Sequence, residues 1–418
     1  MLEYHQFLKS FTDKSSVLMN KTLHALTSFL LCAAMLAQPR LIHAADTGHL
    51  APPPKKAPVI VPTAPKLNAS AYLLVEANSG KILAENNSEK KVPPASLTKM
   101  MTLYVVSKAL QDGQIKLTDT VHISKNAWKT GGSRMFVKEG QDVRIEDLLK
   151  GIIVDSGNDA CVALAEHVGG SEQGFVDIMN QEAKRIGMHN SHFTDSTGLP
   201  KENLYSTAKD LAILARALVK DFPDYYHWYK QKWFTFNEIR QPNRNRLLWR
   251  DNRVDGIKTG HTDKAGYCLA SSARHNDMRL IAIVLGSPTE AARADDSERL
   301  LKYGFRFFET HKLYEAGKPL AELRLYKGVA DALPVGLIKD HYITIPSGQY
   351  QRLTIKTETK KYLKAPINKG EKVGDLVISF NGEVLVEHPL HALQSVDRAG
   401  FFVRAKDSIA LTFKQWMS

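Results

Sequence analysis

The chain has 418 residues, of which 43% are hydrophobic and 24% are charged, and these proportions exclude a disordered or fibrous chain. Its length predicts two or three domains. The formal net charge of +12 favours an anionic partner, whether nucleic acid, anionic lipid or an acidic wall polymer. Three cysteines are too few for a disulfide-based scaffold.

The first 45 residues show the pattern of an export signal. Lys21 precedes an apolar stretch at 23–36, and the small residues Ala44 and Ala45 follow it. This order is typical of a secretory signal peptide that is cleaved near Ala45. We therefore expect residues 1–45 to be a signal peptide, with a retained membrane anchor as the alternative.

A proline-rich segment follows. Six of the 18 prolines lie between positions 47 and 67, which predicts an extended linker at 46–67.

The segment 68–308 mixes strand and helix patterns. Short apolar strands joined by polar turns are predicted at 72–75, 82–84, 266–273 and 280–285. Helical patterns cover 97–110, 145–154, 159–168, 176–186 and 208–219. Because the strands form hairpins and do not alternate with helices, we expect an α/β domain with an antiparallel sheet and a cluster of helices.

The pattern changes after residue 308. Short strands recur at 342–345, 353–355 and 376–380, with turn residues between them. This even spacing predicts a small all-β sandwich, which we assign to residues 309–395.

The last segment, 396–418, is predicted to hold an amphipathic helix. Its large apolar residues recur at roughly helical spacing at Phe402, Ile409, Phe413 and Trp416. Its basic residues are Arg404, Lys406 and Lys414. Such a helix either lies in a membrane interface or packs on its own domain, and these residues alone leave both possibilities open.

The pattern Ser-x-x-Lys occurs three times, at 88–91, 96–99 and 206–209. On a helix this spacing brings a lysine amine near a serine hydroxyl, which needs a base to become a nucleophile. Only Ser96 opens an apolar helix, where burial would lower the pKa of Lys99 and make it a base. Ser88 lies in a polar run at 86–91 with no apolar helix after it. Ser206 precedes a helix, but Lys209 falls in an amphipathic first turn that is expected to be solvated.

Two further motifs also occur twice. Ser-x-Asn appears at 124–126 and 156–158, and Lys-Thr-Gly at 129–131 and 258–260. The copies at 124–131 lie in a polar stretch that predicts a loop. Those at 156–158 and 258–260 lie in a tight break between two apolar helices and on a predicted strand with a free edge. Three motifs in this order and context indicate a serine enzyme.

At these residues the sequence resembles the penicillin-recognising serine enzymes, and more narrowly the low-molecular-mass penicillin-binding proteins that are D-alanyl-D-alanine carboxypeptidases. The resemblance runs from about Ala71 to the C-terminus. It implies a catalytic domain of the transpeptidase/β-lactamase-like fold, followed by the β-sandwich and a tail that holds the protein to a membrane.

The resemblance implies a role for each motif residue. Ser96 would be the nucleophile, Lys99 its base, and Ser156 the group that protonates the departing D-alanine. Asn158 would bind the substrate amide.

The remaining substrate-binding residues follow from the third motif. Lys258 and Thr259 would bind the terminal carboxylate, with help from Arg244. Gly260 would leave room for the substrate backbone, and the backbone N–H groups of His261 and of the nucleophile would hold the oxyanion.

The resemblance also implies partners and a location. The substrate would be a peptidoglycan pentapeptide ending in D-Ala-D-Ala, and β-lactam antibiotics would be covalent inhibitors. The exported protein would act peripherally at the periplasmic face of the inner membrane, with its C-terminal helix on an anionic lipid surface. No cofactor, metal or nucleic-acid partner is expected, since zinc spacing is missing from the sequence and its basic residues are scattered.

Three alternatives stay open at this point. A β-lactamase shares the three motifs, but the Glu-x-x-x-Asn string of the commonest such enzymes is missing between 158 and 258. A non-catalytic wall-binding protein would keep the fold. A D,D-endopeptidase or transpeptidase would use the same nucleophile.

Overall fold

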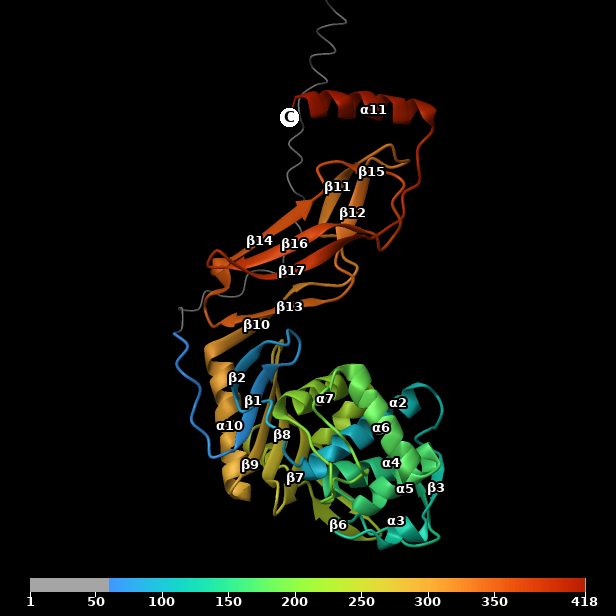
Figure 1. Cartoon of the computed structure of the whole chain (residues 1–418), viewed down its shortest axis with the longest axis vertical. Helices are drawn as coiled ribbons and strands as arrows, with labels where there is room; N and C mark the ends of the chain where they lie inside the picture. The colour runs from blue at the N-terminus through green and yellow to red at the C-terminus, as the bar shows by residue number, and fades with distance from the viewer. Residues whose placement is uncertain (1–59, 418) are drawn as a thin grey trace, which may run out of the picture. The chain divides into compact units, whose positions relative to one another are not determined.

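The computed structural model describes residues 60–417, which Figure 1 traces in colour. The predicted signal peptide and most of the predicted linker lie outside these residues. Residues 60–67 form neither helix nor strand. Their apolar side chains Val61, Ala64 and Leu67 nevertheless pack against a buried cluster, so this end of the linker is part of the first domain.

A five-stranded antiparallel sheet forms the centre of the first domain, with strand order β2-β1-β9-β8-β7. Its strands are β1 (Ala71–Glu76), β2 (Ile82–Asn86), β7 (Val254–Thr262), β8 (Gly266–His275) and β9 (Met278–Ser287). Both predicted hairpins are confirmed, as β1 pairs with β2 and β8 with β9. Strand β7 is at the sheet edge and leaves one side of its backbone unpaired within the sheet.

Both faces of this sheet are covered (Figure 1). Alternate residues of β9 point to opposite faces, so Leu280 and Val284 join one apolar cluster and Ile281 and Ile283 join the other. This explains why β9 is apolar throughout. Helix α10 (Glu290–Phe307), which is not among the predicted helices, covers the first face.

A cluster of helices covers the second face. Its members are α2 (Lys99–Gln111), α4 (Ile145–Lys150), α5 (Asn158–Gly169), α6 (Glu172–Ile186) and α7 (Ala208–Asp221). Helix α2 is buried on nearly all sides and is preceded by the 3-10 turn η1 (Ala95–Thr98). All five predicted helices are present, with ends shifted by a few residues.

One predicted helix is interrupted. The pattern at 145–154 predicts a continuous α-helix, but the α-helical part ends at Lys150 and the wider π-type turn η2 (Gly151–Asp155) follows. The N–H of Gly157 closes this turn on the carbonyl of Gly151 at 3.1 Å. A side chain at Gly151 would collide with Met135, so glycine permits this packing.

Short elements complete the domain. They are β3 (Thr120–His122), α3 (Lys125–Lys129), β4 (Asp142–Arg144), α8 (Pro223–Tyr226), η3 (His227–Lys230), β5 (Trp233–Phe236), β6 (Ile239–Pro242) and α9 (Leu247–Arg250). The loop predicted at 124–131 is wrong in part, because Ser124 caps α3. Its Oγ accepts a hydrogen bond from the N–H of Ala127 at 3.0 Å.

The second domain is all-β, as predicted. A two-stranded sheet pairs β10 (Phe308–Tyr314) with β13 (His341–Pro346). A six-stranded sheet has the order β14 (Leu353–Thr359), β16 (Lys372–Phe380), β17 (Glu383–Ala392), β12 (Ala332–Gly336), β11 (Ala321–Tyr326) and β15 (Leu363–Lys364), with η4 (Tyr350–Arg352) before β14. Ile345 and Ile378 share one core, so the two sheets pack together.

Helix α11 (Phe401–Trp416) follows. It starts later than position 396 because Val396 is buried and pairs with Ile367 of the β-domain. One face of α11 packs on that domain: the carboxylate of Asp407 accepts the backbone N–H of Lys327. Of the helices in residues 60–417, none is long and apolar enough to span a bilayer.

Candidate active site

Ser96 and Lys99 lie where the 3-10 turn η1 passes into α2. Lys99 Nζ donates a hydrogen bond to Ser96 Oγ at 3.0 Å and a second one to the carbonyl of Thr197 at 2.6 Å. The three-residue spacing predicted this serine–lysine contact. The structure shows in addition which backbone group holds the amine in place.

Lys99 is fully buried. Burial lowers the pKa of its amine, and the nearby cation of Arg244 lowers it further, while the carboxylate of Asp195 acts in the opposite direction. A buried amine with a lowered pKa can accept a proton from the serine hydroxyl.

A second serine–lysine pair lies near the first, since the charge of Lys99 acts on Lys258. Lys258 Nζ on β7 donates to Ser156 Oγ at 2.9 Å. Ser156 ends η2 in the left-handed conformation, with φ of 61°. Burial, followed by the charges of Lys99 and Arg244, holds the pKa of Lys258 well below its usual range. A positive charge on one of the two buried amines therefore disfavours protonation of the other.

Strand β7 runs directly beside the first serine. A Cβ added at Gly260 would lie 3.1 Å from the backbone nitrogen of Ser96. Thr259 is buried, and His261 is exposed with its ring 4.0 Å from that of Tyr267, measured between centroids. Glycine at 260 therefore leaves the strand close to Ser96, with no side chain between them.

Asn158 lies at the start of α5, beside Ser156. Its Nδ2 donates to the carbonyl of Gly131 at 2.6 Å. Its Oδ1 is buried and has no hydrogen-bond partner within residues 60–417. Because a buried acceptor without a partner costs free energy, this oxygen is suited to accept an N–H group from a ligand.

Arg244 is exposed, and no ion pair of its side chain is found in the described part of the chain. The buried neighbours Asn243 and Asn245 fix its segment, since Asn245 Nδ2 donates to the carbonyl of Gly256 in β7 at 2.9 Å. Its charge contributes to the lowered pKa values of both Lys99 and Lys258. All nine residues singled out in the sequence are thus gathered in one region.

The turn that holds Lys99 was not found in the sequence. Asp195 Oδ1 accepts the N–H groups of Thr197 at 2.7 Å and Gly198 at 2.6 Å, which directs the Thr197 carbonyl toward Lys99. Gly198 has φ of +82°, and a Cβ there would lie 1.9 Å from the carbonyl oxygen of Ala95. The string at 195–198 carries a turn signal, but nothing local links it to Ser96 or Lys99.

Two buried aspartates were also missed. Burial raises the pKa of Asp155 to about 7, although Arg244 and Lys258 lower it. Asp159 accepts the N–H groups of Met135 and Phe136 at 2.9 Å each, which ties the segment at 135–136 to the start of α5 beside Asn158. Within residues 60–417, no three His, Cys, Asp or Glu side chains are arranged to hold a metal ion.

Residues 59–289 match the family model described as D-alanyl-D-alanine carboxypeptidase. The chain belongs to this carboxypeptidase family. Residues 308–398 of the carboxypeptidase match a second model, the C-terminal domain of penicillin-binding protein 5.

Curated relatives cover most of the carboxypeptidase. It is 45% identical over 361 residues to D-alanyl-D-alanine carboxypeptidase DacC of Escherichia coli (strain K12), covering 84% of this chain and 90% of that protein. It is 43% identical over 365 residues to DacA of the same organism, covering 85% and 91%. The enzyme is a serine-type D-Ala-D-Ala carboxypeptidase and a penicillin-binding protein.

Solved structures agree with the predicted fold. Penicillin-binding protein 5 from Haemophilus influenzae aligns with a TM-score of 0.77 at 43% identity, covering 81% of this chain and 100% of that one. Penicillin-binding protein D2 from Listeria monocytogenes, solved in its ampicillin-bound form, aligns with a TM-score of 0.54 at 28% identity, covering 58% and 100%. The α/β catalytic domain followed by a β-domain is therefore confirmed.

Proposed function

We propose that the carboxypeptidase removes the terminal D-alanine from peptidoglycan pentapeptides through an ester on Ser96. Lys99 accepts the hydroxyl proton as Ser96 Oγ attacks the carbonyl between the two D-alanines. The peptide C–N bond breaks, and the departing amine receives a proton through Ser156, which is hydrogen-bonded to Lys258. Water then hydrolyses the ester and regenerates the serine. The hydrogen bond between Lys99 Nζ and Ser96 Oγ is the observation that carries this proposal.

The substrate is proposed to lie along the edge of β7. Gly260 allows its backbone to approach, and Asn158 Oδ1 accepts its amide N–H. Lys258, Thr259 and Arg244 bind the terminal carboxylate, while the backbone N–H groups of Ser96 and His261 hold the oxyanion. Support comes from the unpaired buried oxygen of Asn158 and from the cations that surround the site.

Mass spectrometry with a D-Ala-D-Ala pentapeptide tests the reaction. Wild type should release one alanine and form a covalent adduct with a labelled penicillin, and Ser96→Ala should do neither. Ser206→Ala is the control, since Ser206 belongs to another copy of the motif and its Oγ hydrogen-bonds with Ser191 instead. Activity retained in Ser96→Ala would disprove the mechanism.

The same assay separates the alternatives. Turnover of penicillin as fast as turnover of the peptide would indicate a β-lactamase. Cleavage of cross-linked stems faster than pentapeptides would indicate the endopeptidase reaction.

The second part of the proposal concerns location. The enzyme would be exported and would act at the periplasmic face of the inner membrane, with α11 lying on anionic lipid. The supporting observation is the exposed face of α11, where Phe402 is 88%, Ile409 73% and Trp416 83% exposed. Deleting residues 401–418 should abolish sedimentation with anionic vesicles while activity on a soluble peptide remains.

A further inference from the structure

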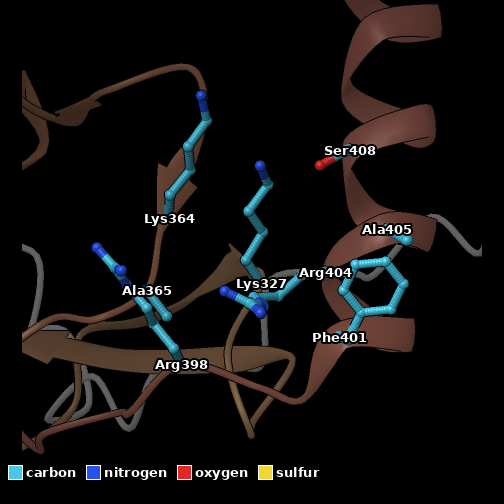
Figure 2. Close-up of a pocket in the computed structure, with 8 residues that line it drawn as sticks. All are labelled: Lys327, Lys364, Ala365, Arg398, Phe401, Arg404, Ala405 and Ser408. Atoms are coloured by element: carbon cyan, nitrogen blue, oxygen red, sulfur yellow. The ribbon is translucent and has the colours of Figure 1, made fainter.

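A pocket of about 560 Å³ lies between α11 and the β-domain. Four of its lining side chains are cationic: Lys327, Lys364 and Arg398 from the β-domain and Arg404 from α11. Figure 2 shows the amines of Lys327 and Lys364 pointing in the same direction. The hydroxyl of Ser408 points toward the amine of Lys327.

Within residues 60–417, none of these four cationic side chains forms a direct ion pair with a carboxylate. The carboxylate of Asp407, nearby on α11, is buried and already accepts the backbone N–H of Lys327. Four like charges around one pocket repel each other, so an anion bound among them would relieve that repulsion.

The pocket lies beside the exposed apolar face of α11. Leu411 is buried on the side of α11 that carries Asp407, and Phe402, Ile409 and Phe413 lie on the opposite side of the helix. Phe401, Arg404 and Ser408 recur at three- and four-residue spacing and form the flank between these two sides. If α11 lies in the membrane surface with its apolar face among the lipid acyl chains, this flank lies at the level of the lipid headgroups.

The donors fit a phosphate group. Arginine presents paired N–H groups to phosphate oxygens, and lysine adds a point charge. The pocket also touches the first turn of α11, whose N-cap Gly400 has no capping side chain, so the N–H groups of this turn add positive potential.

We propose that this pocket binds the phosphate of an anionic membrane phospholipid. The inference rests on the proposed membrane association and adds a defined headgroup site to it. The lipid contact then consists of an apolar helix face and a cationic pocket next to it.

Vesicle sedimentation of the full chain with phosphatidylcholine alone or mixed with phosphatidylglycerol tests the proposal. The pocket variant Lys327→Gln/Lys364→Gln leaves α11 unchanged. It should weaken binding to the anionic vesicles by about tenfold or more. The matched control Lys339→Gln/Lys356→Gln removes the same charge from exposed lysines outside the pocket and should change binding by less than about threefold.

The outcomes are distinct. If wild type fails to bind anionic vesicles, the membrane association itself is wrong. If wild type binds but the two double variants weaken binding equally, only the pocket is wrong, and surface charge accounts for the attraction. All variants should keep carboxypeptidase activity on a soluble peptide, which reports on the catalytic domain. They should also keep the wild-type thermal unfolding of the β-domain, whose core is separate.

Soluble competitors separate a lipid from a free anion. Inorganic phosphate or glycerol phosphate, added at the concentration of lipid phosphate, should not release the protein from the vesicles. Release by inorganic phosphate would overturn the assignment to a lipid headgroup and indicate a site for the free ion.

Discussion

Lys99 and Lys258 each hold a serine hydroxyl in the buried part of the site, and each has a lowered pKa. The two amines have different proposed tasks, because only Lys99 contacts the proposed nucleophile. A base must be neutral to accept a proton. The acylation rate should therefore fall as the pH drops through the lowered pKa of Lys99 and should be full above it.

Lys99→Arg tests this role directly. Arginine keeps the positive charge but stays protonated at any working pH, so acylation by a labelled penicillin should drop by about 10²–10⁴-fold. Lys209→Arg is the control, since Lys209 forms an exposed ion pair with Glu89. A Lys99→Arg enzyme with near-normal acylation would exclude Lys99 as the base.

Asp155 predicts a pH dependence of stability. Burial raises its pKa from 3.8 to about 7, so between these values the folded protein binds a proton that the unfolded chain has lost. The contribution of this proton to the free energy of unfolding is complete below pH 3.8 and is lost as the pH rises through 7. The loss is at most about 4 kcal/mol, since one pKa unit corresponds to about 1.4 kcal/mol.

Asp155→Asn removes this ionisation while keeping the shape of the side chain. The variant should lose less stability than wild type between pH 5 and pH 8, both measured by urea unfolding. Parallel curves for the two proteins would show that Asp155 does not titrate in this range.

At the scale of elements, the turn at 195–198 holds the Lys99 amine from outside the helix of Lys99. Gly198→Ala would force a Cβ to within 1.9 Å of the Ala95 carbonyl at a φ of +82°. We expect a loss of at least about 3 kcal/mol in the free energy of unfolding and slower acylation at Ser96. The control Gly187→Ala has φ of +94° with open space around it and should cost only about 1–2 kcal/mol. Equal effects would mean that the contact with Ala95 does not matter.

Local patterns predicted the elements whose signals lie within one segment. The hairpins of β1–β2 and β8–β9 follow from apolar runs and turn residues, and α2 follows from its continuous apolar sequence. The choice of Ser96 over Ser88 and Ser206 also rested on local context.

Features that depend on distant partners were not predictable in this way. The carbonyl of Thr197 reaches Lys99 across 98 positions of sequence. Asp159 binds N–H groups more than 20 residues before it. Gly151, at the start of the π-type turn, packs so closely on Met135 that a side chain there would collide with it. In each case the contact exists only once the chain has folded.

At the scale of the whole molecule, the two domains have separate cores. The cluster that contains Ile378 includes only residues of the β-domain, whereas the cluster that contains Ile283 includes α2 and the residues beside Ser96. Damage to one core should therefore leave the other intact.

Ile378→Ala should destabilise the β-domain by about 2–5 kcal/mol yet leave penicillin acylation unchanged, because its core is distinct from that of the site. Ile283→Ala, equally buried but in β9, should reduce both stability and acylation. Thermal unfolding and adduct formation, measured side by side, check this. Loss of acylation in Ile378→Ala would show that the two domains depend on each other.

The two cysteines within residues 60–417 have a practical consequence. Both are free and buried, and burial raises the pKa of Cys161 to about 12 and that of Cys268 to about 11. Neither thiol ionises appreciably in the folded protein, so alkylating reagents should modify them only when the structure opens. Cys161 lies close to Lys99, and Cys268 lies in β8. The rate at which each thiol is alkylated should therefore measure how often the catalytic domain opens at these two places.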